Sequence, residues 1–342
     1  MKILESDLYK CDLKKAVNNV DLSALDGKTI FITGGLGLIC STVVDLLLTY
    51  AKTGTIYLGA RSREKFNDRF GGFENVSYVE YDALEKPTLN FKPDFIIAGA
   101  GLASPELYTT KPVETLLSNI DGIHNLLRFV MENRVERLLY ISSSEVYGKK
   151  SSNDSFKEGI YGEIDIDNIR SSYAVAKRAS EMLCKAYCSE YDTDVVIVRP
   201  GHIYGPSAQK EDRRVSSEFA YKAAAGEKII MKSLGLQNRS YCYSVDCAVQ
   251  ILIALLLGEK GQVYNIGHDD VTTIREMAEI LAMAGHTELV MDVPSEEEIK
   301  MFNPMDNSTL DNSKLKNLGY KDSFTTREGI SHTVEILKEF ET

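Results

Sequence analysis

Two side chains that could exchange a proton with a substrate lie one helical turn apart. Tyr173 and Lys177 belong to the stretch Tyr-Ala-Val-Ala-Lys-Arg-Ala-Ser-Glu-Met-Leu, which favours a helix, so both side chains point to one face. A free phenol has a pKa of about 10, and a nearby ammonium favours the phenolate. Such a tyrosine could take a proton from a substrate alcohol at neutral pH. The same spacing is common on solvated helix faces, so the pair indicates a catalytic site only in combination with other motifs of the sequence.

The segment before this pair ends in polar side chains. An apolar run at 138–141 is followed by three serines at 142–144, then by Glu145 and Val-Tyr-Gly. A strand that ends in hydroxyls and a carboxylate presents hydrogen-bonding groups at the carboxyl edge of an open α/β sheet, where such folds bind ligands. The sequence therefore predicts a site at the end of this strand.

A glycine turn near the start of the chain predicts a dinucleotide site. The apolar strand 28–33 runs into Gly34-Gly-Leu-Gly37-Leu38-Ile39-Cys40, and an apolar helix follows at 43–50. Strand, glycine turn and helix in this order are the context that the dinucleotide fingerprint requires. Gly34 and Gly37 suit a tight turn and the close approach of a pyrophosphate to backbone N–H groups. Cys40 replaces the third glycine, and a glycine-rich turn without a ligand is the alternative.

The following strands suggest contacts for the adenosine and leave the choice of cofactor open. After the strand 55–59 an acid is expected to bind the ribose, but the sequence has Arg61, which could meet the 2′-phosphate of NADP or stack on the adenine. Asp82 is a candidate partner for the adenine amino group. Ala100, after the strand 94–98, is small enough to let the cofactor pass close by. The cofactor is therefore NAD or NADP.

The order of the elements predicts an α/β fold with a doubly wound parallel sheet of the Rossmann type. Strands at 28–33, 55–59, 77–81, 94–98, 138–141 and 194–199 alternate with helices, the longest at 114–133 and 172–191. After residue 200 the pattern changes to a smaller α+β lobe, with a strand at 228–231, helices at 216–225, 245–257, 274–284 and 327–340, and a loop at 292–311. The predicted division is an N-terminal lead-in at 1–27, a dinucleotide-binding domain at 28–200 and a substrate-binding lobe at 201–342. The lead-in is expected to be an appendage, with short helices at 12–20 and 22–25.

Composition excludes several classes of partner. The 342 residues are 44% hydrophobic, the net charge is -11 and the pI is about 5.1, which argues against nucleic acid or an anionic membrane as the main partner. A membrane span needs about 18 consecutive apolar residues, and no apolar run approaches this length. The first residues also lack the apolar core of a signal peptide, so a cytoplasmic protein is expected. The six cysteines fit reduced thiols, and no His or Cys set has metal-ligand spacing, so no metal is predicted.

With these motifs in order, residues 28–338 resemble the extended short-chain dehydrogenases that modify nucleotide sugars. Several stretches look most like UDP-glucuronate decarboxylases, namely Ala103-Ser104-Pro105 followed by Tyr108, Thr115 to Asn119, Ser144 to Gly148, Asp212 to Ser216, and Gln237 to Tyr241. By this resemblance Ser143 binds the sugar C4 oxygen, Tyr173 accepts the proton, Lys177 binds the nicotinamide ribose and lowers the tyrosine pKa, and Glu145 is an acid/base or orienting carboxylate beside C5. The resemblance also assigns Asn119 to the cofactor, Ser104, Ser144, His202 and Arg214 to the substrate, and Arg239 to its diphosphate.

Departures from the family pattern bear on the substrate and the reaction. The family commonly has asparagine where this chain has His202, and glycine where it has Arg213. Position 144 is serine, whereas dTDP-glucose 4,6-dehydratases carry an aspartate there, and simple 4-epimerases generally lack a carboxylate at position 145. The resemblance therefore implies oxidation of the sugar at C4 followed by decarboxylation or dehydration, with a tightly bound cofactor. An epimerase, a reductase and a non-catalytic NAD(P)-sensing protein are the alternatives. The resemblance also implies a homodimer that pairs through the helices at 114–133 and 172–191.

Overall fold

A seven-stranded parallel sheet forms the centre of the larger part of the molecule. The computed structural model describes residues 3–150, 152, 154–292 and 307–340. The strand order is β10-β6-β5-β4-β1-β2-β3. The strands are β1 (Ile30–Thr33), β2 (Ile56–Ala60), β3 (Val76–Glu80), β4 (Phe95–Ala98), β5 (Arg137–Ile141), β6 (Val195–Pro200) and β10 (Val263–Ile266). The predicted doubly wound parallel sheet is confirmed.

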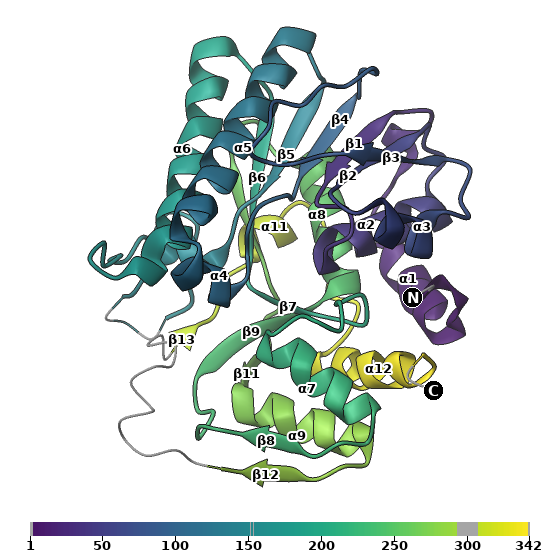
Figure 1. Ribbon diagram of the computed structural model, residues 1–342, viewed down its shortest axis with the longest axis vertical. Helices are drawn as coiled ribbons and strands as arrows, with labels where there is room; N and C mark the ends of the chain where they lie inside the picture. The colour runs from purple at the N-terminus through teal and green to yellow at the C-terminus, as the bar shows by residue number, and fades with distance from the viewer. Residues whose placement is uncertain (1–2, 151, 153, 293–306, 341–342) are drawn as a thin grey trace.

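Helices cover both faces of this sheet because both faces of its strands are apolar. In β1, Ile30 and Ile32 belong to one core cluster and Phe31 to the other, as expected for side chains that alternate along a strand. Figure 1 shows α5 and α6 on one side of the sheet and α2 and α8 on the other. The helices of this part are α2 (Leu38–Tyr50), α3 (Arg63–Phe70), α4 (Pro105–Thr110), α5 (Pro112–Asn133), α6 (Ser172–Tyr191) and α8 (Ser244–Leu257).

The large sheet takes its outermost strand from beyond residue 200. β10 pairs with β6, with Val263 opposite Ile197, and α8 packs against α2 on one face. This strand was not predicted, because Val-Tyr-Asn-Ile is short and has neither a clear alternation nor a strong apolar run. The chain therefore leaves the large sheet for the smaller lobe and returns to it. The division at residue 200 remains a prediction about which segments bind the substrate.

Among the described residues, the smaller lobe combines two small sheets with four helices. One sheet has the order β11-β9-β13 with β7 also paired to β9, and the other pairs β12 with β8. Its elements are β7 (His202–Tyr204), α7 (Val215–Ala224), β8 (Ile229–Met231), β9 (Asn238–Tyr243), β11 (Val271–Thr273), α9 (Ile274–Gly285), β12 (Leu289–Met291), β13 (Asn307–Ser308), α11 (Ser313–Lys316) and α12 (Thr326–Lys338). The predicted helices are present, whereas β7, β9, β11 and β12 were missed, as was β13, which lies within the predicted loop 292–311. Most of the predicted loop 292–311 lies outside the described residues.

The N-terminal segment is part of the core, and its prediction as an appendage was wrong. α1 (Asp7–Val17) buries Tyr9 and Leu13 completely. The Tyr9 hydroxyl donates to Asp45 Oδ2 at 2.9 Å, and the Tyr243 hydroxyl donates to Asp12 Oδ2 at 2.8 Å. Apolar side chains at helical spacing were the available signal, hidden among polar neighbours. α1 therefore connects the large sheet's helices with the smaller lobe.

We expect the stability of this junction to depend on pH through His332. Its Nδ1 lies 2.9 Å from Asp12 Oδ1, and hydrogen bonding to Asp12 raises the pKa of His332. A raised folded pKa means that the stabilisation is complete below the unfolded pKa of about 6.5 and is lost as pH rises through the folded value. His332→Gln should lower the free energy of unfolding by about 1–2 kcal/mol at pH 6 and by much less at pH 9. Chemical denaturation at both pH values measures this, and an equal loss at both would contradict it.

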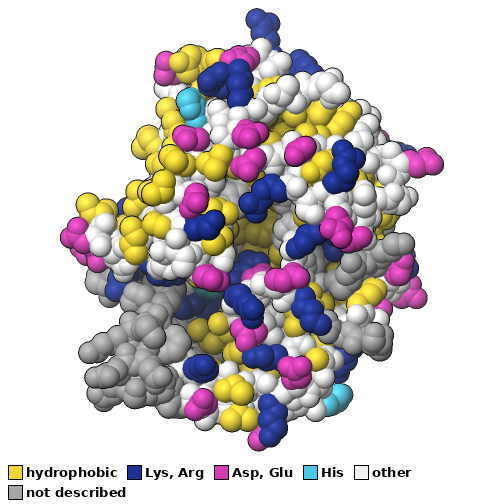
Figure 2. Space-filling view, viewed as in Figure 1, with side chains coloured by type: hydrophobic (Ala, Val, Ile, Leu, Met, Phe, Trp, Pro, Cys, Tyr) yellow, Lys and Arg dark blue, Asp and Glu magenta, His cyan; other side chains and the backbone are white. Residues whose placement is uncertain are grey.

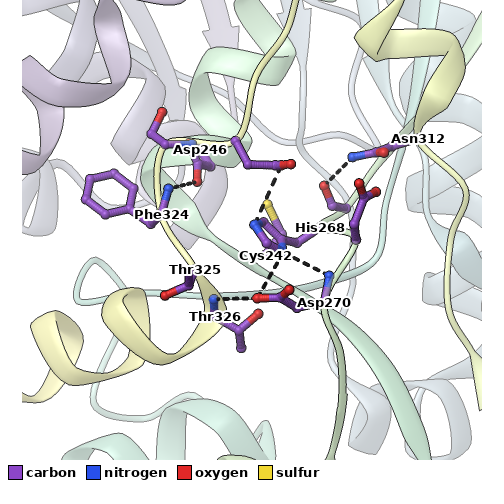
Figure 3. A network of polar contacts seen from close by, with 12 residues as sticks. Cys242, Asp246, His268, Asp270, Asn312, Phe324, Thr325 and Thr326 are labelled. Atoms are coloured by element: carbon purple, nitrogen blue, oxygen red, sulfur yellow. Dashed lines mark hydrogen bonds and ion pairs between the residues drawn. The ribbon is translucent and has the colours of Figure 1, made fainter.

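A polar network holds the segment that leads into α12. Figure 3 shows Asp246 accepting a hydrogen bond from the Phe324 backbone N–H, at 3.2 Å, and Asp270 accepting one from Thr326, also at 3.2 Å. His268 Nδ1 in turn accepts the Asp270 backbone N–H at 3.0 Å. Burial raises the pKa of Asp246 to about 6. These contacts position α12 relative to α8 and β10, so their role is to hold the smaller lobe together.

All six cysteines are free thiols, as predicted for a reduced chain. Cys184 is buried and Cys188 is partly buried. Within the ranges given above, no helix is long and apolar enough to cross a membrane. No group of three or more His, Cys, Asp or Glu side chains in those ranges could hold a metal ion.

Candidate active site

A cavity of about 950 Å³ lies between the carboxyl edge of the large sheet and the smaller lobe. Figure 2 shows a hollow at the centre of the molecule, with basic and acidic side chains on its rim. Most of the predicted site residues line this cavity, namely Gly34, Gly37, Leu38, Ile39, Arg61, Asp82, Ala100, Ser104, Ser143, Ser144, Glu145, Tyr173, Lys177, His202 and Arg214. The fold therefore brings together segments that lie far apart in the sequence.

The glycine turn forms a close-packed cradle at one wall of the cavity. Gly34 has φ +69°, and a Cβ at this position would lie 2.8 Å from the Gly99 carbonyl oxygen. α2 begins at Leu38, and its N-cap Gly37 provides no side-chain cap for the first N–H groups. These N–H groups can donate hydrogen bonds to a phosphate at the positive end of the helix. These residues fit the pyrophosphate of a dinucleotide.

Cys40, at the position of the third glycine of the fingerprint, packs against Gly99. A Cβ on Gly99 would lie 2.4 Å from Cys40 Sγ, so the thiol occupies the space that this glycine leaves. Burial raises the pKa of Cys40 to about 12, so the group is a neutral thiol. The small cysteine serves the contact between helix and sheet.

Tyr173 and Lys177 face the cavity from α6, as predicted. The Lys177 ammonium lies 5.8 Å from the centre of the Tyr173 ring and donates to the Ile141 carbonyl at 2.9 Å. The Tyr108 ring stacks on Tyr173, with 4.4 Å between ring centres and an angle of 6° between their planes. Contacts with neighbouring residues therefore restrict the conformations of both Tyr173 and Lys177.

Burial dominates the pKa values of this pair. Burial raises the pKa of Tyr173, and the Glu145 carboxylate raises it further, while a hydrogen bond with Ser143 lowers it. Burial also lowers the pKa of Lys177 to about 8. These surroundings favour the protonated phenol of Tyr173, and the role of Lys177 in lowering the tyrosine pKa stays a prediction.

Glu145 lies beside these groups on the short helical turn η3 (Ser144–Tyr147). Ser143 caps this turn, since its hydroxyl accepts a hydrogen bond from the Glu145 backbone N–H at 3.2 Å. Burial raises the pKa of Glu145, and Arg170, whose Nη2 lies 3.5 Å from Glu145 Oε1, opposes this effect. Burial therefore shifts the pKa of Glu145 toward the pH range in which an acid/base group works.

Arg170 was not predicted, although it lies close to Tyr173 in the sequence. It belongs to η4 (Ile169–Ser171), just before α6, and its guanidinium lies 5.7 Å from the centre of the Tyr108 ring. An arginine just before the tyrosine motif was the available signal. The side chain connects the Glu145 carboxylate with the stacked tyrosines.

We expect Arg170 to set the protonation of Glu145. In Arg170→Gln the opposing charge is lost, so the pKa of Glu145 should rise, and the limb of the kcat profile that reports this carboxyl should move to higher pH by about one unit. The displacement should appear in kcat, with a smaller change in KM. Arg170→Lys keeps the charge and should restore most of the profile. Equal pH profiles for wild type and Arg170→Gln would contradict this role.

The substrate side of the cavity carries His202 and Arg214. His202 lies on β7, and its Nδ1 is buried without a hydrogen-bond partner among the described residues. Burial, with Arg239 and Arg214 nearby, lowers the pKa of His202 to about 3, so the imidazole is neutral. Arg214 forms an ion pair with Asp212. The neutral His202 ring therefore lines the substrate side of the cavity together with Arg214, whose charge Asp212 partly compensates.

Two predicted residues lie behind the cavity wall. Asn119 is 2% exposed, and its side-chain amide donates to Thr115 at 2.8 Å and to Leu102 at 3.3 Å. Arg239 is also 2% exposed and donates to the Asn238 carbonyl at 2.8 Å. Neither lines the cavity. In this structure Asn119 supports the loop that contacts the cavity, and a direct contact of Arg239 with diphosphate remains a prediction.

Several lining residues were missed by the sequence. Gln209 donates to the Leu36 carbonyl at 3.1 Å, so it bridges the smaller lobe and the glycine turn. Lys65 on α3 donates to Gln209 Oε1 at 2.9 Å. Ser308 on β13 also faces the cavity. Single polar residues in a loop or on a helix carry no pattern, so only the fold could show that they meet here.

The chain matches the NAD dependent epimerase/dehydratase family over residues 30–267. It is 32% identical to UDP-glucuronic acid decarboxylase 6 of Arabidopsis thaliana over 310 residues, 88% of this chain and 86% of that protein. It is 26% identical to dTDP-D-glucose 4,6-dehydratase of Bos taurus over 91% of this chain and 89% of that protein. The chain therefore belongs to the NAD dependent epimerase/dehydratase family, as an enzyme of the extended short-chain dehydrogenase type.

Solved structures share the fold. A UDP-glucose 4-epimerase from Thermus thermophilus, in complex with NAD, superposes with a TM-score of 0.78 at 23% identity, over 92% of this chain and 100% of that chain. An epimerase from Methanothermobacter thermautotrophicus gives a TM-score of 0.82 at 20% identity, over 97% and 96% of the two chains. Members of the family bind NAD, and the cradle at Gly34 fits such a dinucleotide.

Proposed function

We propose that this enzyme oxidises a nucleotide sugar at C4 with a tightly held NAD or NADP and then removes the C6 carboxylate as carbon dioxide. The observation that carries the proposal is that Tyr173 and Glu145 line the same cavity and that Arg170 pairs with Glu145. Glu145 Oε1 lies 3.5 Å from the Arg170 guanidinium, and Tyr108 stacks on Tyr173 next to them. A base for the C4 hydroxyl thus stands beside a carboxylate and a cation that suit chemistry at C5 and C6.

The side chains divide the reaction between them. Ser143 holds the C4 oxygen, and Tyr173 takes its proton as the C4 hydrogen leaves with two electrons. A nicotinamide bound beside these residues would supply the acceptor and later the donor of that hydride. Lys177 positions the cofactor's ribose beside Tyr173.

The ketone at C4 makes the second step possible. With the ketone at C4, a C6 carboxylate is part of a β-keto acid. The bond between C5 and C6 can therefore break, so that carbon dioxide leaves and the electron pair of that bond stays on the sugar as the C4–C5 enolate. A proton must then reach C5, and Glu145, whose pKa burial raises, is placed to deliver it. After the hydride returns to C4, the product carries one carbon fewer.

Dehydration is the second candidate, because Glu145 could also serve as the base at C5. With a hydroxyl at C6 instead of a carboxylate, removal of the C5 proton by Glu145 and protonation of the leaving hydroxyl would expel water. Ser144 is a weaker acid than the aspartate that dTDP-glucose 4,6-dehydratases have there. Simple epimerisation or reduction uses no carboxylate at position 145. A non-catalytic sensor of NAD(P) would need neither Tyr173 nor Lys177.

A panel of nucleotide sugars tests the proposal. Incubation with UDP-, GDP-, dTDP- and CDP-linked glucose and with UDP-glucuronate, followed by mass spectrometry, distinguishes the reactions. We expect UDP-glucuronate to lose one carbon dioxide. Loss of one water from a hexose would favour dehydration, and a product of unchanged mass would mean epimerisation. No conversion of any sugar would count against the proposed function.

We also propose a homodimer, formed by α5 and α6, in a cytoplasmic enzyme. These adjacent helices expose large apolar side chains, namely Val113, Leu117, Met182 and Tyr191. Light scattering at micromolar concentration should give about twice the 38.1 kDa of one chain. Met182→Glu should shift the protein toward the monomer, whereas Met283→Glu on α9, where the side chain is equally exposed at 66%, should not. A mass near that of one chain for the wild type would contradict the dimer.

A further inference from the structure

The carboxyl end of β2 carries positive charge where a dinucleotide-binding sheet usually presents an acid. β2 pairs with β1 so that Gly59 lies opposite Thr33, which places its end beside the glycine turn. An acid at this point normally hydrogen-bonds the ribose 2′-hydroxyl of NAD. Here the sequence is Ala60-Arg61-Ser62-Arg63. The end of this strand therefore offers no carboxylate to that hydroxyl.

The two arginines at this end have different surroundings. Arg63 lies over the Tyr78 ring, with its guanidinium carbon 4.5 Å from the ring centre, and does not line the cavity. Arg61 lines the cavity and makes no hydrogen bond or ion pair with any residue in the described part of the chain. An unpaired guanidinium at a ligand site can bind a phosphate through two parallel hydrogen bonds. Only Arg61 is available for this.

Ser62 and Lys65 line the same wall. Ser62 caps α3, and its hydroxyl oxygen accepts the Lys65 backbone N–H at 3.2 Å, which leaves the hydroxyl proton free to be donated. The Lys65 ammonium donates to the neutral amide of Gln209 and lies 4.0 Å from Glu211. Lys65 and Glu211 are both exposed, so their ion pair is weak and leaves most of the ammonium charge available. Two cations and a hydroxyl thus line the cavity just beyond the end of β2.

Asp82, an acidic residue that lines this side of the cavity, does not lie at the end of β2. Asp82 follows β3, which lies farther from the glycine turn than β2. Its Oδ1 accepts the Leu84 backbone N–H at 2.9 Å, so it is held in its own loop. It therefore does not replace the missing acid at the end of β2.

We propose that Arg61, Ser62 and Lys65 form a subsite for a phosphate on the 2′ oxygen of the adenosine ribose. The enzyme then takes NADP in preference to NAD, unlike the structural neighbours that were solved with NAD. This inference rests on the dinucleotide site of the proposed function and names the form of dinucleotide that the site selects. Arg61 pairs with the phosphate dianion, and Ser62 and Lys65 donate to its remaining oxygens.

Binding measurements on the full chain test the subsite without relying on turnover. NADPH and NADH are titrated against the purified protein, with their fluorescence as the signal, and the nucleotide released by denaturing the protein is identified by mass. We expect NADPH to bind at least about tenfold more tightly than NADH, the scale of a charge-assisted hydrogen bond. The released nucleotide should be NADP or NADPH.

Three variants make the test specific. Arg61→Ala should remove most of the preference by weakening NADPH, with NADH changed less than about threefold. Arg61→Asp should reverse the preference, because a carboxylate repels the phosphate and can accept the 2′-hydroxyl. Arg63→Ala, which removes a guanidinium of the same kind outside the cavity, should leave the ratio as in wild type.

The outcomes separate this inference from the proposed function. Equal or tighter binding of NADH by the wild type would overturn the subsite and leave the proposed function standing. An unchanged ratio in Arg61→Ala would also overturn the subsite. Failure of the wild type to bind either dinucleotide would overturn both.

Discussion

Replacing Tyr173 with phenylalanine should lower turnover by about two to four orders of magnitude, the usual cost of losing a general base. The ring is buried and stacks on Tyr108, and phenylalanine retains this contact, so the fold and the cofactor cradle should persist. The hydroxyl that exchanges a proton with the C4 oxygen is lost. Steady-state kinetics with the best substrate of the panel measures the effect, while cofactor binding and the melting temperature show whether the site is intact.

Tyr147→Phe is the matched control for this variant. Tyr147 is also fully buried, and its hydroxyl donates to Asn265 Oδ1 at 2.5 Å, but it does not line the cavity. Its loss should lower stability by about 1 kcal/mol and change turnover little. If Tyr173→Phe retained near wild-type turnover, Tyr173 would have no part in the chemistry.

The second large effect is expected for Glu145→Gln, which should divide the reaction into its two steps. Oxidation at C4 needs Ser143, Tyr173 and the cofactor, whereas the step at C5 and C6 needs the carboxylate. In a single turnover the variant should still reduce its bound cofactor, seen as absorbance at about 340 nm. Product should form at least about a hundredfold more slowly than in wild type. The 4-keto sugar should accumulate.

Stability measured on the same variant distinguishes a chemical role from a structural one. The carboxylate of Glu145 faces Arg170 and caps no backbone N–H among the described residues. Its substitution should therefore change the melting temperature little. Normal cofactor reduction together with normal product formation would contradict the decarboxylation and dehydration proposals alike, because an epimerase or a reductase does not need Glu145.

The sequence predicted those parts of the site that follow regular patterns. Gly34 and Gly37 stand between a strand and a helix, and Tyr173 and Lys177 share a helix face, so their positions follow from local geometry. The end of β5 follows from the rule that parallel strands present ligands at their carboxyl edge. The structure brings all of these residues to one cavity.

Other features depend on tertiary contacts that no local pattern contains. Gln209 and Lys65 meet only because the smaller lobe folds back over the glycine turn. α1 lies in the core because Tyr9 reaches Asp45, a contact between distant segments. The pKa of Tyr173 could not be read from its spacing to Lys177, since it also depends on burial and on the Glu145 carboxylate.

The most direct test of the central proposal follows the absorbance of the bound cofactor at about 340 nm after rapid mixing of the wild-type enzyme with UDP-glucuronate. An enzyme that oxidises C4 and later returns the hydride should show a rise and a decay within one turnover. Carbon dioxide should appear between the two, and no external cofactor should be consumed. Product formation without any transient reduction, or with continuous consumption of added NADPH or NADH, would contradict the account.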